Sequence, residues 1–215
     1  MPADPPVRQM SEAVKPFVAS QAALFEAAAQ EFAERGFDAA GVDRIAARAG
    51  VNKAMIYYHY SSKRGLYVAV LRDVFRAVGT RARAVADGPG TARQKLDTWI
   101  ATIVDAASAR PWFPPIMLRE LASGAPRFDP ETFALMNAVF VAVRDILAAG
   151  QREGVFREVD PLLTHLTIMP PVLLFFARQR VLATVRPGTG LLEPRHLDEF
   201  VRYMQDAMQR MLRKD

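Results

Sequence analysis

The chain has 215 residues, of which 51% are apolar and 24% charged, and this composition excludes wholesale disorder. It has no cysteine, which excludes disulfides, cysteine-ligated metals and a thiol nucleophile, and no two of its three histidines stand i, i+4 as a helix-borne metal pair requires. The formal net charge is +5, an excess that bears on nucleic-acid binding where it is concentrated in one place.

The N-terminal third has the apolar spacing of helices separated by short turns. Gly36 stands where a glycine in the left-handed conformation ends a helix, and Gly50 lies in a tight turn. Asn52 is a suitable cap for the helix after that turn, and Ser61 or Ser62 for the next one. After a Pro-rich flexible tail at 1–13, helices are predicted over 14–35, 42–49, 53–59 and 62–87.

Helical patterns continue to the C-terminus, without the alternation typical of strands. Thr91, Asp129 and Asp160 are predicted helix caps, and proline follows the last two at the first helical position. Pro170 and Pro171 inside an apolar helix remove backbone hydrogen bonds and predict a kink. A loop is expected at 186–190.

These elements predict an all-α protein of about nine helices. Its parts are expected to be the tail 1–13, an N-terminal three-helix domain over 14–65 with a helix-turn-helix, and a larger helical bundle over 66–215. No secretory signal is recognisable near Met1, and the longest apolar run is shorter than the roughly 20 residues of a membrane span. We therefore expect a cytoplasmic protein with no membrane partner.

The helices 42–49 and 53–59, joined by a glycine-containing turn, form a candidate helix-turn-helix. In such a unit the second helix lies in the major groove of DNA, with its N-terminal residues facing the bases. Lys53 can donate to guanine or to a phosphate, and Met55 can contact a thymine methyl group. Tyrosine hydroxyls and Lys63 suit phosphate oxygens, which fix register without reading sequence.

The basic charge is concentrated around this motif. Between Arg44 and Arg72 the sequence contains no Asp or Glu. An ordinary solvent-exposed helix face can also carry such a run of basic residues, so the charge alone does not establish that the chain binds nucleic acid. The basic residues of this stretch are Arg44, Arg48, Lys53, Lys63, Arg64 and Arg72.

Six segments match one family pattern in order and spacing: Leu24–Ala28, Phe32–Phe37, Val42–Ala46, Ala49–Asn52, Ile56–Tyr60 and Ser62–Leu66. Over nearly fifty contiguous residues the chain thus resembles the DNA-binding domain of TetR/AcrR-family transcriptional regulators. The resemblance implies a homodimeric repressor whose C-terminal domain binds a small ligand that weakens DNA binding.

The resemblance also implies roles for individual residues. Arg44 is expected to contact a phosphate from the first helix of the motif, although Gly41 brings no hydroxyl where Ser or Thr is usual. His59 is alternatively a packed, hydrogen-bonded residue at the helix end. The base-facing positions are Lys53, Ala54 and Met55, and the backbone contacts or their supports are Tyr57, Tyr58, His59 and Lys63.

The C-terminal bundle contains many aromatic and Met side chains, which suit either a plain core or an adaptable apolar site. Spacing does not distinguish these two alternatives, and the resemblance is what favours a ligand pocket. The candidate pocket residues are Trp99, Ile103, Phe113, Met117, Met136, Phe140, His165, Met169 and Phe176.

The last two long helices are expected to form a dimer interface. Residues 162–183 are apolar almost all round, which favours a partner surface. The final helix carries an apolar stripe at helical spacing. The candidate interface residues are Leu197, Phe200, Val201, Met204 and Met208.

The sequence therefore predicts a DNA-binding transcriptional regulator, namely a repressor that binds a near-palindromic operator as a dimer and is released by a small, largely apolar effector. A ligand-independent DNA-binding or interaction protein of the same fold is the alternative. No nucleophile–base set, glycine-rich phosphate loop or metal-ligand cluster is found, so we expect neither an enzyme nor a cofactor nor a metal.

Overall fold

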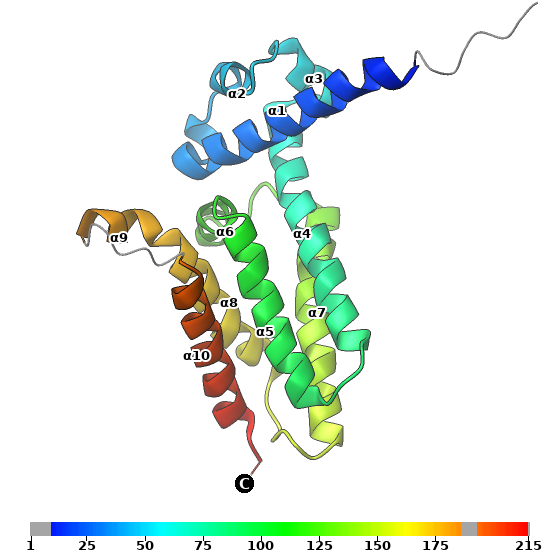
Figure 1. Cartoon of the computed structure of the whole chain (residues 1–215), viewed down its shortest axis with the longest axis vertical. Helices are drawn as coiled ribbons and strands as arrows, with labels where there is room; N and C mark the ends of the chain where they lie inside the picture. Colours follow the sequence, from blue (N-terminus) through cyan, green and yellow to red (C-terminus); the bar gives the residue numbers. More distant parts are fainter. Residues whose placement is uncertain (1–9, 186–192, 215) are drawn as a thin grey trace, which may run out of the picture. The chain divides into compact units, whose positions relative to one another are not determined.

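The computed structural model describes the backbone of residues 10–185 and 193–214, and the side chains of 21–179, 181, 182, 184, 185 and 193–214. Within these residues the only pairing of strand type is an isolated bridge between Phe156 and Arg213. The expected all-α class is confirmed (Figure 1). The helices are α1 (Met10–Ala39), α2 (Val42–Ala49), α3 (Ala54–Tyr60), α4 (Lys63–Asp87), α5 (Ala92–Ala109), α6 (Phe113–Ala122), α7 (Pro130–Arg152), α8 (Pro161–Ala177), α9 (Gln179–Val185) and α10 (Pro194–Leu212).

Two details differ from the expectation, and two predicted segments lie outside the described residues. The described residues contain ten helices rather than about nine, because the single apolar helix expected after Asp160 is divided at Arg178 into α8 and α9. Residues 10–13, expected in the tail, belong to α1. The rest of that tail, 1–9, and the loop predicted at 186–190 lie outside the described residues.

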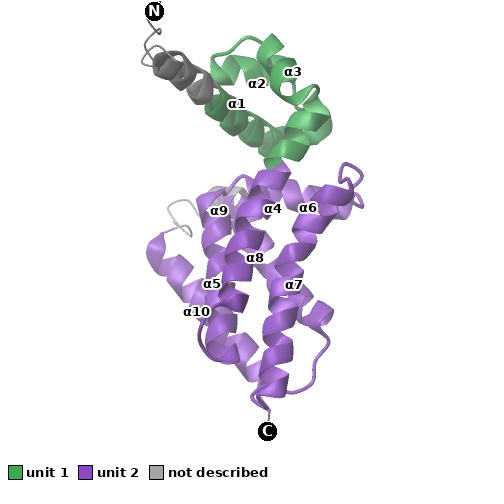
Figure 2. Cartoon of the chain, turned by 90° about the vertical axis from the view of Figure 1, so that its right-hand side faces the viewer, with its two compact units in different colours: residues 1–70 green, residues 71–215 purple. Residues whose placement is uncertain are grey.

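The chain folds as two compact units, Met1–Val70 and Leu71–Asp215 (Figure 2). The division falls inside α4, as the predicted boundary between residues 65 and 66 does, but five residues later. Ser62 is the side chain that caps α4, because its Oγ accepts a hydrogen bond from the Gly65 N–H at 2.9 Å.

The core of the first unit is built from one apolar face of each helix. Gly36 has φ 74°, the left-handed conformation predicted for it, and this interrupts the regular part of α1. The bend brings Phe37 beside Tyr67, with ring centroids 5.0 Å apart, and Tyr67 in turn packs edge-on against Phe32. The fully buried residues of this core include Leu24, Ala28, Phe32, Ile45, Ile56, Leu66 and Val70.

In the second unit, side-chain caps fix where the helices begin. Thr91 forms a capping box with Gln94 at the start of α5. Asp129 accepts from the Thr132 N–H at 2.9 Å, and Asp160 accepts from the Leu162 N–H at 2.7 Å. Pro130 and Pro161 then occupy the first helical position, where a missing N–H costs nothing. All three predicted caps are confirmed.

Helix α5 lies at the centre of this unit and packs against α7, α8 and α10. Its Trp99, Ile100 and Ile103 are at most 3% exposed. Helix α8 continues past Pro170 and Pro171, both of which are exposed. Helix α7 is long and apolar enough to cross a membrane by length and composition, but its buried stripe from Val139 to Leu147 is that of a core helix, which passes the same test.

One glycine marks the tightest packing of the second unit. Gly150 lies inside α7, and a Cβ atom there would stand 2.0 Å from the ring of Phe156, which is 2% exposed. At Gly79 of α4 the added Cβ would only touch the Cβ of Ala138 at 3.4 Å.

These two helical glycines should respond oppositely to alanine. Gly150→Ala should lower the free energy of unfolding by about 1–3 kcal/mol, because overpacking displaces Phe156. Gly79→Ala should be neutral or raise it by about 0.5–1 kcal/mol, because alanine favours the helix. Urea unfolding of both variants measures this, and equal changes would contradict the assignment of Gly150 to a packing limit.

Candidate nucleic-acid interface and ligand cavity

The turn between α2 and α3 is fixed by its own hydrogen bonds. Gly50 adopts φ 66°, which lets the Val51 N–H bond the carbonyl of Ala46 at 3.1 Å. Asn52 Oδ1 accepts from the Ala54 N–H at 2.8 Å and so caps α3 as predicted. Ile56 is fully buried beneath the motif, and its burial determines which face of α3 points outward.

The outward face of α3 contains several of the predicted DNA contacts. Tyr57 and Tyr58 are 48% and 75% exposed, an unusual degree for large aromatic side chains. Lys53 and Ala54 are also exposed. Met55 and His59 are half-buried, so they lie at the edges of this face.

Lys53 is joined to the first helix of the motif by an ion pair. Its Nζ lies 2.8 Å from Asp43 Oδ1, and both side chains are largely exposed to solvent. The hydrogen bond from Lys53 to Asp43 raises the pKa of the lysine, which stays charged at neutral pH. Asp43 therefore holds a potential base-reading ammonium beside α2.

Lys63 is positioned at the start of α4 by two neighbours. Its Nζ donates to the carbonyl of Asp38 at 3.2 Å and lies 4.7 Å from the ring centroid of Phe37. Arg64 is exposed next to it. In the described part of the chain neither side chain pairs with a carboxylate, so this is where basic charge remains uncompensated.

Gly65 closes the approach between α3 and α4. A Cβ atom at this position would lie 2.0 Å from the carbonyl oxygen of Tyr60, a distance that backbone atoms cannot relieve by a rotamer change. The glycine thus lets the start of α4 lie directly against the end of α3.

Arg44 is exposed, and its guanidinium is held by partners within the first unit. Its Nε donates to Glu31 Oε1 at 2.6 Å and one Nη donates to the carbonyl of Ala39. Glu31 is 1% exposed and also accepts from the Gly41 N–H at 3.3 Å. Arg44 therefore joins α2 to α1 inside the first unit, and this pairing was invisible in the local sequence around the motif.

The carboxylate of Glu31 stays ionised despite its burial. Burial by itself opposes the charged form, but the hydrogen bonds from Arg44 and Gly41 and the charges of Arg44 and Arg35 outweigh it. The pKa of Glu31 is consequently below its usual 4.5.

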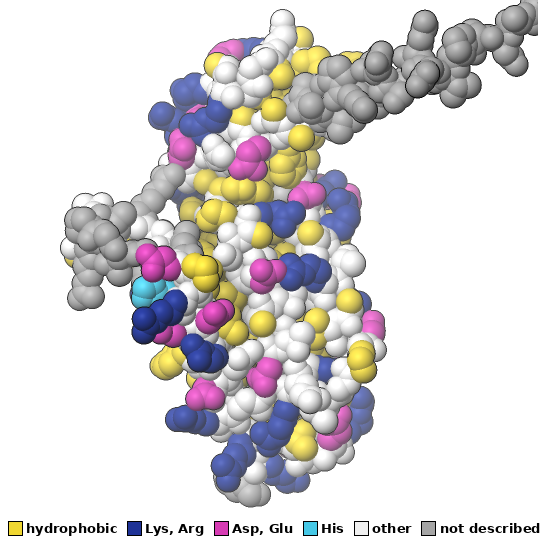
Figure 3. All heavy atoms as spheres, in the orientation of Figure 1, with side chains coloured by type: hydrophobic (Ala, Val, Ile, Leu, Met, Phe, Trp, Pro, Cys, Tyr) yellow, Lys and Arg dark blue, Asp and Glu magenta, His cyan; other side chains and the backbone are white. Residues whose placement is uncertain are grey.

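The acid-free run between Arg44 and Arg72 is thus compensated by acids outside it. Arg48 pairs with Glu34 at 3.0 Å. Arg72, in the second unit, pairs with Asp129 and, at 2.7 Å, with Glu131. The view in Figure 3 accordingly shows basic and acidic side chains interspersed rather than one continuous basic field.

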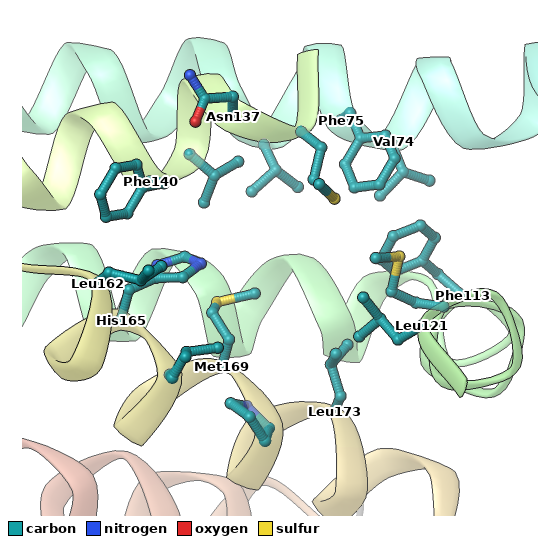
Figure 4. A pocket seen from close by; sticks show the side chains of 16 residues that line it. Val74, Phe75, Phe113, Leu121, Asn137, Phe140, Leu162, His165, Met169 and Leu173 are labelled. Atoms are coloured by element: carbon teal, nitrogen blue, oxygen red, sulfur yellow. The ribbon is translucent and has the colours of Figure 1, made fainter. Parts of the chain in front are cut away.

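The second unit contains a cavity of about 380 Å³, within the size range of small-molecule sites. Figure 4 shows His165 and Phe140 at one end and Phe113 and Leu121 at the other. The lining residues are Val74, Phe75, Val78, Phe113, Met117, Leu121, Met136, Asn137, Val139, Phe140, Leu162, His165, Leu166, Met169, Pro170 and Leu173.

Part of the predicted pocket lines this cavity and part does not. The predicted residues found in the lining are Phe113, Met117, Met136, Phe140, His165 and Met169. Trp99, Ile103 and Phe176 are instead core residues, at most 3% exposed, because their sides of α5 and α8 face neighbouring helices. The sequence analysis missed the contribution of α4 (Val74, Phe75 and Val78), whose apolar spacing is also that of a plain core helix.

Two members of the predicted dimer stripe on α10 are buried within their own chain. Met204 and Met208 are 5% and 4% exposed and belong to the core of their own chain. Leu197, Phe200 and Val201 are half-buried against that core, with the Phe200 ring stacked on Phe175 at 4.1 Å. The stripe therefore serves first to hold α10 on its own protomer.

Most of the exposed large apolar side chains of the second unit lie on α8 and α9. Leu163, Leu166 and Leu174 are 65%, 52% and 58% exposed, and Val181 and Val185 are exposed further along. Apolar residues at such density on one side are typical of an interaction surface. Among the described residues, no three His, Cys, Asp or Glu side chains form a group that could hold a metal ion.

Comparison with known proteins now decides the family. Residues 24–70 match the bacterial regulatory proteins of the tetR family, and residues 93–208 match the tetracyclin repressor-like C-terminal domain. The chain belongs to the TetR family. It is thus a DNA-binding transcriptional regulator of a family that homodimerises on operator DNA, and it is not an enzyme, as expected from its sequence.

Three relatives illustrate the match. The HTH-type transcriptional repressor NicS of Pseudomonas putida is 28% identical over 155 residues, 71% of this chain and 73% of NicS. The repressor SCO4008 of Streptomyces coelicolor is 34% identical over 66% of this chain and 70% of its own. A TetR-family regulator from Marinobacter aquaeolei superposes with a TM-score of 0.72 at 21% identity, covering 94% of this chain and 99% of that one.

The Glu31 cluster yields a stability prediction. Glu31→Gln should lower the free energy of unfolding at pH 7 by about 1–3 kcal/mol, because Arg44 loses its buried ionic partner. Since the folded pKa is the lower one, the contribution of Glu31 is complete above about pH 4.5 and is lost as the pH falls through the folded value.

Urea unfolding at pH 7 and at about pH 4 measures both effects, and the difference between wild type and variant should shrink at the lower pH. Glu26→Gln is the matched control, because Glu26 is exposed on the same helix. A gap that widens on acidification would contradict the proposed pairing.

Proposed function

We propose that this TetR-family regulator is a cytoplasmic repressor that binds a near-palindromic operator as a dimer and is released by a small, largely apolar effector. The observation that carries the proposal is the presence, in one chain, of an exposed helix-turn-helix face and of an apolar cavity of ligand size. Repression is favoured because NicS and SCO4008 are repressors.

The DNA contacts divide into two groups. Lys53, Ala54 and Met55 at the start of α3 face the bases, where Lys53 exchanges Asp43 for a guanine acceptor or a phosphate. The phosphates are held by a second set around the α3–α4 junction, which consists of Tyr57, Tyr58, Lys63 and Arg64, with His59 supporting the helix end. Arg44, exposed on α2 and held in place by Glu31, contacts a further phosphate.

Substitutions in the two groups should have different signatures. Lys63→Ala should weaken binding to all sequences about equally and lower the slope of log affinity against log salt by about 2, because each dimer loses two phosphate contacts. Met55→Ala should leave that slope unchanged and alter base preference at one position of each half-site. Fluorescence anisotropy with operator variants at several salt concentrations measures both.

Arg210→Ala is the control, because Arg210 is an exposed cation on α10 of the second unit. Equal effects of Lys63→Ala and Met55→Ala on slope and base preference would overturn the division of roles. Absence of salt-dependent binding to any near-palindrome upstream of the gene would overturn DNA binding by this chain.

We place the dimer interface on the outer face of α8. Leu163, Leu166 and Leu174 recur at helical spacing on the solvent side of this helix. Leu197, Phe200 and Val201 of α10 flank it as half-buried neighbours. Two such surfaces related by a two-fold axis would set two recognition helices on half-sites about 34–36 Å apart, or a multiple of that distance.

Charge on this face should separate the protomers. Leu163→Asp and Leu174→Asp should shift the chain from dimer to monomer in light scattering after size exclusion, because a carboxylate is costly to bury at an apolar interface. Ala134→Asp, at an exposed position of α7, is the control and should remain dimeric. Dimers that persist in both leucine variants, with unchanged helical circular dichroism, would place the interface elsewhere.

Release from DNA follows from population shift. An effector in the cavity favours whichever conformation binds it better, and it weakens operator binding only through that difference in affinity. Regulation without a ligand is the alternative. It predicts that compounds that bind the cavity leave operator affinity unchanged.

A further inference from the structure

His165 is the polar group that faces the interior of the cavity. Its ring lies edge-on to Phe140, with centroids 5.5 Å apart, and 6.1 Å from the ring of Trp99 (Figure 4). Asn137 is the other polar residue among the described lining residues, and it is exposed at the rim. Hydrogen-bonding capacity is therefore concentrated at one end of an otherwise apolar chamber.

The imidazole has bonding capacity that the protein does not use. Nδ1 of His165 is buried, and no protein group among the described residues hydrogen-bonds to it. The buried Nε1 of the neighbouring Trp99 is in the same state. Buried polar atoms are nearly always paired in folded proteins, so a polar atom of a bound molecule would find a partner here.

The cavity offers no compensation for a charged ligand. None of its described lining residues is Lys, Arg, Asp or Glu. Burial lowers the pKa of His165 to about 4, so the ring is neutral at physiological pH. A buried ion without a counter-charge is strongly disfavoured, whereas a neutral hydroxyl is satisfied by one hydrogen bond.

The volume limits the size of the ligand. A cavity of about 150 Å³ accommodates benzene. The cavity of about 380 Å³ thus suits a molecule about two to three times as large. Its rim residues Leu121 and Leu162 are half or more exposed, which leaves an apolar entrance.

We propose that the effector is an uncharged apolar molecule of this size, such as a fused-ring alcohol or phenol, whose single hydrogen-bonding group sits on His165, and that carboxylates of the same shape are rejected. The inference rests on the proposed effector function of the cavity. A hydroxyl suits either tautomer of the neutral imidazole, because it both donates and accepts.

Three probes of nearly equal shape test this proposal: naphthalene, 2-naphthol and 2-naphthoate. Equilibrium dialysis against the full chain at pH 7 should show 2-naphthol binding on the order of tenfold more tightly than naphthalene. The ionised 2-naphthoate should bind more weakly than naphthalene. The same probes are then added to operator-bound protein to measure release.

Variants of α8 assign the preference to His165. His165→Leu should keep naphthalene binding and reduce the tenfold preference for 2-naphthol to about one. His165→Asn, whose amide lies near the position of Nδ1, should keep part of the preference. Thr167→Ala, at an exposed position of the same helix outside the lining, should keep all of it. Thermal unfolding checks that each variant is folded.

The outcomes separate the two levels of the proposal. Failure of all three probes to bind, or binding without operator release, would overturn the proposed effector site and this inference with it. Binding of naphthalene without a preference for 2-naphthol would overturn the inference alone, as would tighter binding of 2-naphthoate or an unchanged preference in His165→Leu.

Discussion

The DNA-binding unit depends on a single buried carboxylate. Glu31 of α1 is removed from water and must be paired where it stands. The guanidinium of Arg44 and the N–H of Gly41 meet that need, and both belong to the start of α2. Because this charge must be paired, α2 is held at a fixed position against α1. The position of α2 in turn sets the orientation of the recognition helix α3 and of its outward side chains.

The second unit is organised by a different constraint, the division of apolar side chains between filled and unfilled space. Helix α5 places Trp99 and Ile103 among neighbouring helices, where packing is complete. Helices α4, α6, α7 and α8 surround space that side chains leave open. Residues of the same chemical type thus serve as core on one side of the bundle and as cavity wall on the other.

The fold was largely predictable because its signals are local. Caps such as Thr91, Asp129 and Asp160 lie next to the helices they start, and Gly36 and Gly50 mark turns by their own conformational freedom. Ile45 and Ile56, both fully buried, mark the inward face of the helix-turn-helix.

The sites were less predictable for two reasons. Some of their residues contact partners that are distant in sequence, and others line a cavity, which has no sequence pattern of its own. Glu31 lies 13 residues before Arg44, so a count of charges within the motif did not include it. Spacing recognised the stripe of α10 as apolar, but an amphipathic helix does not reveal whether its partner is its own chain, as it is for Met204. No sequence pattern distinguishes Phe140, beside a void, from Trp99, inside a core.

The close approach at Gly65 bears on how such a regulator can change its target. The backbone contact with Tyr60 sets the recognition helix against α4 without using any side chain that faces DNA. The scaffold and the reading surface are therefore encoded by separate residues. A substitution at a position such as Met55 therefore leaves this close approach intact, so a change of base preference does not require a change of scaffold.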